Sequence, residues 1–502
     1  TPLAAAVAPD NPLVGVMVAY TPLHHLLFRG VPGTDVEPPR LLVMTSGNRS
    51  DEPICFDDDD ARVRLADLAD AFCTHDRPIE VPCDDSVVRV VAGEVQPIRR
   101  SRGYAPVPVR LPFDAPPVLG VGGELKNTCC VASGRHAWVG EHIGDMEHLA
   151  TLSAFAASVE AFTTMDRARP VAYGVDRHPG YLTRRWALER VGRGHDDRAP
   201  DGRDGGDGVT GSDGDGVRIV DVQHHHAHVA AAMAEHGLAV ADEVLGFSFD
   251  GTGYGEADDG TAQIWGGEVL VAGYAGFERV AHLRPLPLPG GDEAVRNPCR
   301  IALAYLTALG VPAGDDLPAV AACDDVERRV IPRQVERGVA CTPTTSMGRL
   351  FDAVSSLLGV RHRISYEAQA AIELEHVAEQ GEPGAVALRF GCDDGTIDAG
   401  PVLADLARHV RSGARVADLA LAFHVAVADA SACLAERYAA GRPVVLTGGV
   451  FQNALLTSLA RERLDGFEVL THHLVPPNDG GLSLGQAVIA AVAMRSIAEG
   501  SS

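Results

Sequence analysis

Two histidines spaced four residues apart are the sharpest chemical signal in this sequence. His224 and His228 lie in VQHHHAHVAAAMAEHG, whose alanine-rich continuation predicts a helix. Residues four apart share one face of a helix, so both imidazoles point the same way and are spaced to bind one metal ion through ring nitrogens. The alternative is a histidine-rich helix start that packs against a sheet. Other acidic and glycine-rich motifs in the chain favour the metal site.

Two aspartates that precede glycines are the next candidates for chemistry. An apolar strand predicted over 244–249 leads into Asp250 and Gly251, and Asp479 precedes Gly480 in PPNDGGLSLGQA. An aspartate at a strand end is well placed for a metal ion or a phosphate-bound cation, and glycines let backbone amides approach phosphate oxygens. A plain β-hairpin turn is the alternative at Asp250.

Two further glycine-rich loops follow predicted strands. VVLTGGVFQNALL carries Gly448 and Gly449 at a strand-to-helix junction typical of a nucleotide-binding turn, with Asn453 near the helix start. VLGVGGELKNT contains Lys126, the only lysine of the chain. An ammonium is a compact point charge, whereas a guanidinium is a broad planar fork, so a phosphate loop has a reason to keep a lysine. The alternative is a lysine left by chance.

The elements that must position these residues alternate as in an α/β protein. From Val118 to about residue 497, apolar strands, glycine turns and amphipathic helices follow one another. Residues 1–108 are interpreted as a separate first unit, and the proline-spaced residues 109–117 as a linker. The segment 192–216 is almost entirely Gly, Asp, Arg and Ser, and it is predicted to be a disordered surface insertion because it cannot bury enough apolar area.

Composition excludes several classes of function. The net charge of −25 over 502 residues argues against a general nucleic-acid binder, because binding to a phosphate backbone depends on basic clusters. No uninterrupted apolar run reaches the roughly 18 residues of a membrane-spanning helix, and the N-terminus lacks the pattern of a signal peptide, so we expect a cytoplasmic protein without a membrane partner. The ten cysteines include no C-x-x-C pair and are interpreted as reduced, mostly buried thiols.

Taken together, the motifs resemble the C-terminal part of the HypF family, the carbamoyltransferases that mature NiFe hydrogenases. The resemblance rests on GELKNT, EHIGD, DRHPGYLTRRWA, QHHHAH, SMGRLFDAVSSLLG, YEAQAAIELE, LTGGVFQN and PNDGGLSLGQ. It implies a two-lobed fold over 118–498, shared with actin, sugar kinases and Hsp70 chaperones (ASKHA). Residues 1–108 resemble the latter part of a YrdC-type domain, which makes acyl-adenylates, through VMTSGNRSDEPI, HDRPIEVPCDDSVVR and IRRSRGYAP.

The resemblance also implies a reaction. The full protein would split carbamoyl phosphate, capture the carbamate on ATP (with Mg) as carbamoyl-adenylate, and pass the carbamoyl group to the C-terminal cysteine thiol of its partner HypE, for synthesis of the active-site cyanide ligands. His224, His228 and Asp250 would be catalytic, and with Asp479 they would bind one divalent metal ion, zinc or iron.

The resemblance assigns two further sets of residues. Lys126, Asn127 and Thr128 would contact the phosphates of the nucleotide, and Thr252 and Gly253 would close over these phosphates. The adenosine side would be bound by Glu367, Gly448, Gly449 and Asn453. The YrdC-type site would include Ser46, Asn48, Arg99, Arg100 and Arg102, the arginines forming a basic patch suited to phosphates.

Departures from the family pattern keep other functions open. HypF proteins normally begin with an acylphosphatase-like domain, zinc fingers and the first half of the YrdC domain, so we expect this chain to be a C-terminal portion with an incomplete first domain. A tRNA threonylcarbamoyl transferase is disfavoured by the acidic composition and the YrdC-like segment. An O-carbamoyltransferase of small hydroxylated metabolites has the two domains in the reverse order. An ATP-dependent binding module with the same fold would not need the histidine pair.

Overall fold

The computed structural model describes residues 5–49, 52–192, 208–210, 216–257 and 259–500. The chain divides into two compact units, Thr1–Pro82 and Cys83–Ser502. The first unit contains η1 (Ala5–Val7), α1 (Pro22–Leu27) and α2 (Asp58–Arg64). None of its described residues is buried.

The unit boundary differs from the predicted one, because residues 83–108 belong to the second unit. They include a two-stranded hairpin of β1 (Val87–Val91) and β2 (Glu94–Arg99). An isolated hairpin is marginally stable in water and needs a packing partner. Here Arg89 of β1 lies 2.8 Å from the buried carboxylate of Glu375, which joins the hairpin to a helix far along the chain.

The segment predicted as a linker is a strand. β3 (Val109–Gly120) pairs antiparallel with β4 (Cys130–Val139). Its side chains alternate between buried and less buried positions from Val109 to Ala115, which is the period of a strand with one face in the core. The linker prediction was wrong because it gave the prolines more weight than this alternation. The register of the β3–β4 pair shifts between Arg110 and Val118, and this irregular stretch accommodates prolines that cannot donate to the ladder.

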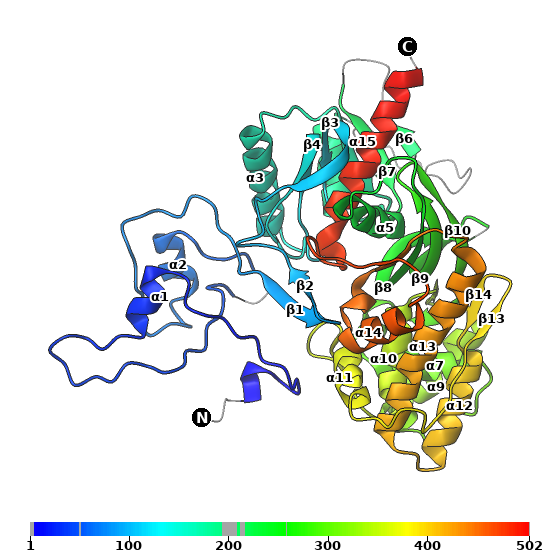
Figure 1. The fold of residues 1–502 in the computed structure, drawn as a ribbon. Coiled ribbons are helices and arrows are strands. Elements are labelled where there is room, and N and C mark those ends of the chain that lie inside the picture. The colour runs from blue at the N-terminus through cyan, green and yellow to red at the C-terminus, as the bar shows by residue number, and fades with distance from the viewer. Residues whose placement is uncertain (1–4, 50–51, 193–207, 211–215, 258, 501–502) are drawn as a thin grey trace. The chain divides into compact units, whose positions relative to one another are not determined.

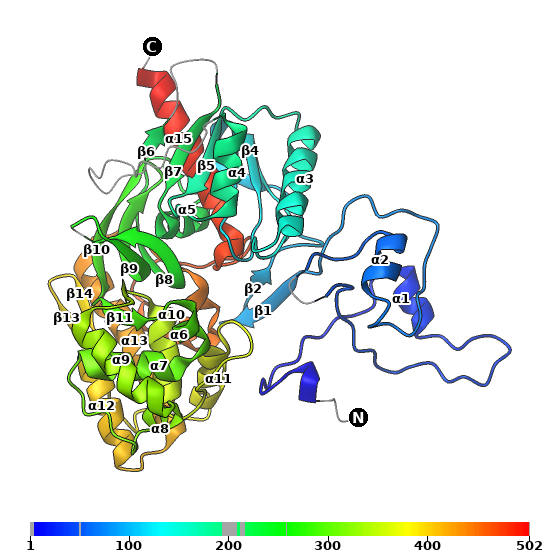
Figure 2. The same ribbon diagram turned by 180° about the vertical axis from the view of Figure 1, so that it is seen from behind.

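The first lobe of the second unit is a five-stranded sheet in the order β4-β3-β5-β7-β6. Three parallel strands form its centre: β3, β5 (Ala172–Asp176) and β7 (Arg218–Val222). Helices α3 (Leu149–Met165) and α4 (Leu182–Arg190) cover one face, whereas α5 (His224–Glu235) and α15 (Leu482–Gly500) cover the other (Figures 1 and 2).

The glycine-rich segment predicted as a disordered insertion lies largely outside the described residues. Residues 193–207 and 211–215 of the segment 192–216 are not described. Between them, β6 (Gly208–Thr210) pairs antiparallel with β7 at the edge of the first sheet.

The second lobe contains a nine-stranded sheet, in which β13-β14-β10-β9-β8-β15-β16 form the main path and β12 joins β11 to β9. The strands are β8 (Val244–Glu256), β9 (Ala262–Gly273), β10 (Gly276–Leu283), β11 (Leu286–Pro289), β12 (Cys341–Thr344), β13 (Gly391–Asp393), β14 (Thr396–Asp398), β15 (Val444–Thr447) and β16 (Val469–Leu470).

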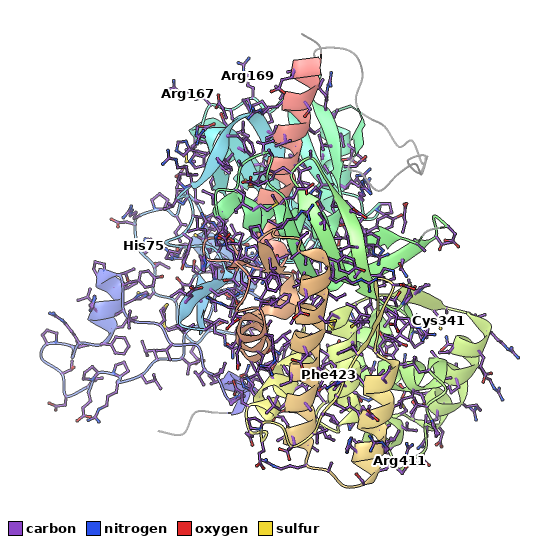
Figure 3. All side chains as sticks on the ribbon, turned by 45° about the vertical axis from the view of Figure 1, so that its right-hand side comes forward. His75, Arg167, Arg169, Cys341, Arg411 and Phe423 are labelled. Carbon is purple, nitrogen blue, oxygen red and sulfur yellow. The ribbon has the colours of Figure 1, made fainter. Side chains whose placement is uncertain are left out.

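A thick layer of helices packs below this sheet (Figure 1). Its helices are α6 (Asp292–Arg296), α7 (Pro298–Ala308), α8 (Pro318–Ala322), α9 (Asp325–Arg337), α10 (Met347–Leu357), α11 (Gln369–Ala378), α12 (Gly400–Arg411), α13 (Val416–Tyr438), η2 (Gly449–Gln452) and α14 (Ala454–Arg463). Phe423 of α13 is buried inside the layer, whereas Arg411 lies at its outer end (Figure 3).

The alternation of strands and helices confirms the predicted α/β class. Two helices, α13 and the segment from Asp479 through α15, are long and apolar enough to cross a membrane by length and composition, but 67% of each apolar window is buried inside the protein. Their apolar side chains belong to the two large hydrophobic cores. We therefore interpret both as core helices.

Candidate metal centre

Four buried side chains converge between the two lobes. His224 and His228 on α5, Asp250 on β8 and Asp479 at the start of η3 (Asp479–Gly481) each contribute one ligand atom within 4.8 Å of the other three. The predicted metal ligands are therefore brought together. His228 Nε2 lies 3.0 Å from Asp250 Oδ2 and 3.6 Å from Asp479 Oδ1.

This donor set fits a divalent metal ion. His224 Nε2 is buried without a hydrogen-bond partner, and it lies 3.5 Å from Asp250 Oδ2 and 3.7 Å from Asp479 Oδ1. Two imidazole nitrogens and two carboxylate oxygens form a set that zinc and iron accept. A cation bound between this nitrogen and the two carboxylates would supply the partner that the buried nitrogen lacks.

Local sequence explains how α5 presents its histidines. The helix begins at His224, and the side chain of Gln223 accepts hydrogen bonds from the backbone N–H groups of His225 (2.6 Å) and His226 (3.0 Å), which caps its first turn. Helix α15 packs against α5, and its Gly485 approaches the backbone of Ala227 so closely that no side chain would fit there. Capping and close packing therefore fix the first turn of α5.

Asp176 orients His224 and was missed by the sequence analysis. Its Oδ2 lies 2.8 Å from His224 Nδ1, and both side chains are buried. A carboxylate on the second nitrogen of a histidine fixes the ring and its tautomer, which is the usual arrangement around a metal-binding histidine. The available signal was the position of Asp176 at the end of the apolar strand β5, the same kind of position as the one predicted for Asp250.

We expect Asp176→Asn to lower metal affinity about 10- to 100-fold, because the amide keeps the shape of the side chain but loses the charge that orients the imidazole. Competition with a chelator of known affinity measures the loss. Asp114→Asn, an exposed aspartate on β3, is the control. Equal affinities for the two variants would contradict the assignment.

The protonation of the cluster follows from its pairing. Burial lowers the pKa of His224, but the charge of Asp176 and the hydrogen bond with its carboxylate outweigh it, so the pKa is well above its ordinary value. Burial also lowers the pKa of His228, but the carboxylates of Asp250 and Asp479 outweigh it and the pKa is raised. Burial raises the pKa of Asp479, but the two histidines outweigh it and the pKa falls to about 2. A metal ion competes with protons for these imidazole nitrogens, so its affinity rises with pH.

The strand that carries Asp250 does not end there, contrary to the prediction. β8 continues to Glu256, and its register with β9 shifts between Phe249 and Gly253. A Cβ atom at Gly253 would lie 2.8 Å from His224 Cδ2, so this glycine lets the strand pack against the histidine ring. Thr252 is exposed beside it.

The Gly448–Gly449 junction lies against the metal cluster. Gly448 has φ 92°, a conformation that favours glycine, and the Gly449 N–H donates to Asp250 Oδ1 at 3.2 Å. Asn453 caps α14 by accepting from the Leu456 N–H at 2.8 Å. The loop therefore positions Asp250, and Asn453 contributes to the helix start.

Lys126 forms an ion pair that crosses from the first lobe to the second. Its Nζ contacts Glu367 Oε2, and its own N–H donates to Asp145 Oδ1 at 2.8 Å. Glu367 was expected on the adenosine side of a nucleotide, and the structure places it directly beside Lys126. Burial lowers the pKa of Lys126, but Glu367 and Asp479 outweigh it and the pKa is raised, so the ammonium stays charged.

The side chains of Asn127 and Thr128 form hydrogen bonds within the protein. Both side chains are buried, and Asn127 Nδ2 donates to the carbonyl oxygens of Val121 (2.9 Å) and Gly123 (2.7 Å). Thr128 Oγ1 donates to the Gly480 carbonyl at 3.0 Å. These polar side chains are used to hold the Lys126 loop and to join it to the turn that carries Asp479.

Arg349 is a second cation beside the cluster that the sequence analysis did not single out. It lies on α10, and a Cβ atom at Gly251 would be 3.2 Å from its Nη2. Its Nη1 pairs with Asp352 at 3.1 Å, and its Nε is buried without a partner. The motif SMGRLFDA contributed to the family resemblance, but nothing in its pattern indicated that this arginine reaches the Asp250 loop.

The residues predicted for the YrdC-type site are divided between the two units. The side chains of Ser46 and Asn48 contact each other in the first unit. Of the predicted basic patch, Arg99 lies 3.9 Å from Asp84, and Arg102 pairs with a neighbouring aspartate at 3.1 Å.

Arg100 is not part of an exposed basic patch. It is 3% exposed, and its guanidinium donates to the carbonyl oxygens of Leu474 (2.9 Å) and Val107 (2.6 Å). Arg100 therefore ties its segment to these backbone carbonyls and is not available to an exposed patch.

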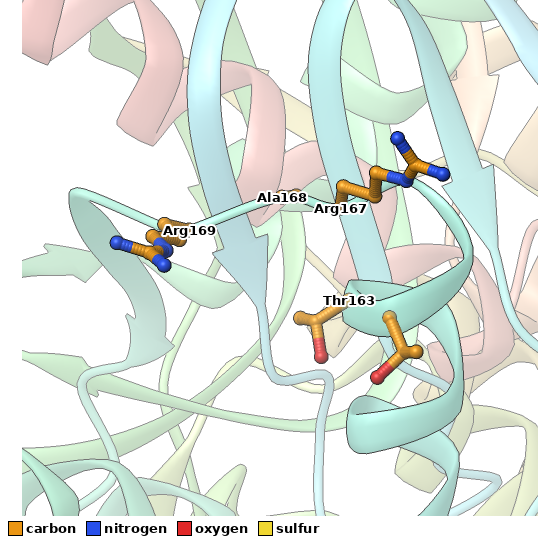
Figure 4. Close-up of a pocket in the computed structure, with 5 residues that line it drawn as sticks. Thr163, Arg167, Ala168 and Arg169 are labelled. Atoms are coloured by element: carbon orange, nitrogen blue, oxygen red, sulfur yellow. The ribbon is translucent and has the colours of Figure 1, made fainter.

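One surface hollow contains none of the predicted residues. It lies at the C-terminal end of α3 and is lined by Thr163, Thr164, Arg167, Ala168 and Arg169 (Figure 4). The guanidinium groups of its two arginines point in different directions. Cations are favourable at the negative end of a helix, which explains these arginines without a ligand.

Three family models match successive parts of the chain. A YrdC-type family model described as telomere recombination matches residues 1–101. A model described as HypF Kae1-like domain matches 113–235, and one described as carbamoyltransferase, Kae1-like domain, second subdomain, matches 246–486. The two histidines fall in the first of these Kae1-like regions and the two aspartates in the second.

Three individual proteins show the extent of the similarity. Carbamoyltransferase HypF2 of Cupriavidus necator is 38% identical and is matched over 97% of this chain and 61% of its own length. A carbamoyltransferase HypF homolog of the same organism is 35% identical over 75% of this chain and 92% of its own length. A crystal structure of full-length HypF in the phosphate- and nucleotide-bound form has a TM-score of 0.83 and 34% identity, covering 98% of this chain and 73% of the other.

These similarities confirm the predicted fold, a YrdC-like domain followed by a two-lobed Kae1-like domain. The chain spans 58–62% of the length of the curated relatives that match nearly all of it.

Proposed function

The chain belongs to the HypF family of carbamoyltransferases, and on this premise we propose that its two-lobed domain transfers a carbamoyl group to a thiol during the maturation of NiFe hydrogenases. The donor is carbamoyl-adenylate, made from carbamoyl phosphate and ATP with Mg by the whole protein in the cytoplasm. The acceptor is the C-terminal cysteine of HypE, and the product supplies the cyanide ligands. The observation that carries the proposal is the four-residue cluster between the lobes.

The cluster residues provide the metal site at which the carbamoyl group reacts. His224 and His228, with Asp250 and Asp479, are the residues that would bind zinc or iron. When bound, the ion supplies a positive charge that polarises the bond between the carbamoyl carbon and the phosphate. Asp176 keeps His224 in the required orientation, and the protein supplies this positive site locally although its net charge is −25.

The loops around the cluster bind the nucleotide. The Lys126 ammonium exchanges its ion pair with Glu367 for the phosphate of the adenylate, and Arg349 neutralises the same group from the second lobe. Thr252 and Gly253 close over the phosphate. The turn of Gly448 and Gly449, with Asn453, faces the adenosine side. The positive φ of Gly448 and the position of Gly449 beside Asp250 support this arrangement.

A single-step assay tests the transfer. Purified metal-loaded chain is mixed with supplied carbamoyl-adenylate and HypE, and mass spectrometry of the C-terminal HypE peptide measures the carbamoyl group. A HypE variant with serine in place of that cysteine is the control for the acceptor. Transfer to the cysteine alone supports the proposal. ATP-dependent binding of HypE without transfer would favour a binding module, and carbamoylation of tRNA or of a small hydroxylated compound would favour the other transferases.

A further inference from the structure

A second buried cluster lies in the helical layer of the second lobe, outside the metal centre. The Cys299 and Cys323 thiols and a carboxylate oxygen of Glu327 lie within 4.8 Å of one another. All three side chains are buried, with exposed fractions of 0%, 2% and 4%. The proposed transfer reaction does not use any of them.

Hydrogen bonds of neighbouring residues keep the two thiols close together. Arg300 follows Cys299 at the start of α7, and its Nε donates to Glu327 Oε1 at 2.7 Å. Glu327 also accepts from the backbone N–H of Asp324 at 2.8 Å, directly after Cys323, in the capping box of α9. The same carboxylate is thus tied to the residue next to each cysteine, which limits how far the two sulfur atoms can separate.

The two thiols are chemically different. Cys299 lies in the first turn of the eleven-residue helix α7, where the helix dipole favours a thiolate. The contact with Cys323 lowers the pKa of Cys299, whereas the same contact and burial raise the pKa of Cys323. A more acidic thiol beside a less acidic one is the arrangement of a reactive cysteine and its resolving partner.

The surroundings argue against a metal ion at this cluster. It offers three ligand groups among the described residues, whereas a structural zinc site takes four. Its carboxylate already accepts from Arg300 and Asp324, and Arg363 Nη2 lies 3.4 Å away. Two guanidinium charges next to Glu327 disfavour the approach of a further cation. The side chain of Arg363, which contacts Glu327, is 52% exposed.

From this geometry we infer that Cys299 and Cys323 form a reversible redox pair, which peroxide oxidises to a disulfide. The Cys299 thiolate attacks one peroxide oxygen and the O–O bond breaks. That oxygen remains as a sulfenic acid, and the other leaves as hydroxide and is protonated to water. The Cys323 sulfur then attacks the Cys299 sulfur, the S–O bond breaks, and the leaving hydroxide takes the Cys323 proton as a second water. Two electrons pass from the thiols to peroxide, and a dithiol reductant reverses the step.

Peptide mapping of the reduced 502-residue chain after hydrogen peroxide treatment tests the inference directly. We expect a Cys299–Cys323 crosslink, a fall from ten free thiols to eight, and recovery of all ten with dithiothreitol. In Cys323→Ser the sulfenic acid cannot be resolved, so dimedone should label Cys299. In Cys299→Ser, Cys323 should remain unlabelled.

Cys129→Ser is the matched control, because it removes another buried cysteine and leaves the pair intact. This variant should still form the crosslink. Peroxide treatment that leaves Cys299 and Cys323 unlinked in the wild-type chain would overturn the inference. So would a zinc ion that co-purifies with the chain and is lost in Cys299→Ser, which would show a metal site instead. Because the test needs no carbamoyl transfer, its outcome is independent of the proposed function.

Discussion

Replacement of His228 by alanine should abolish carbamoyl transfer from supplied carbamoyl-adenylate and leave the fold intact. His228 Nε2 is the nitrogen nearest to Asp250 in the cluster, at 3.0 Å. Changes to the outer partners of metal ligands already cost about 10- to 100-fold in affinity, so loss of a ligand itself should cost more. Metal content of the purified variant and the rate of transfer to HypE measure the two effects.

A neighbouring histidine provides the control for this result. His226 is buried on the same helix, but its Nε2 bonds the Gly273 carbonyl at 2.6 Å and contributes no ligand to the cluster. His226→Gln keeps a donor at this position and should retain metal and activity. Unchanged transfer by His228→Ala would contradict the metal assignment, whereas an equal loss in both variants would indicate damage to α5 rather than to the site.

The metal ligands could be predicted from the sequence because each has a local signature. The i to i+4 spacing fixes the two histidines on one helical face, and an aspartate before a glycine marks the end of a loop or strand. Asp176 could not be assigned in the same way, because its contact with His224 depends on parallel pairing of β5 with β7, two strands that are distant in the sequence. The contact of Glu367 with Lys126 could not be predicted for the same reason, since it joins residues 241 positions apart.

The error over residues 109–117 has a different physical origin. Prolines are rare inside sheets, so a proline-spaced segment favours a linker when it is read alone. The apolar alternation of β3 buries Leu111 and Phe113 in the core, and the gain from this burial exceeds the cost of an irregular ladder. The prolines predict a linker, whereas the apolar alternation predicts a strand. The conflict is resolved by the pairing of β3 with the rest of the sheet.

Lys126→Ala should lower nucleotide affinity about 10- to 100-fold, because a hydrogen bond between charged groups contributes about 1.5–3 kcal/mol. Lys126→Arg should recover only part of this loss, since a guanidinium is bulkier and needs a forked partner. Isothermal titration of an adenine nucleotide into the purified chain measures each affinity. If Lys126→Arg binds and transfers like the wild type, the lysine has no special role.

Glu367→Gln separates two roles for the acidic partner. The Lys126 and Glu367 side chains are 29% and 55% exposed, and an ion pair this accessible contributes at most about 1 kcal/mol, so a phosphate can replace the carboxylate. If Glu367 holds the ammonium only until the nucleotide binds, Glu367→Gln should raise nucleotide affinity, by up to about fivefold. In the Lys126→Ala background the same change should have little effect, since no competition remains to be relieved. A fall in affinity in both backgrounds would instead assign Glu367 to the adenosine, as the sequence resemblance implied.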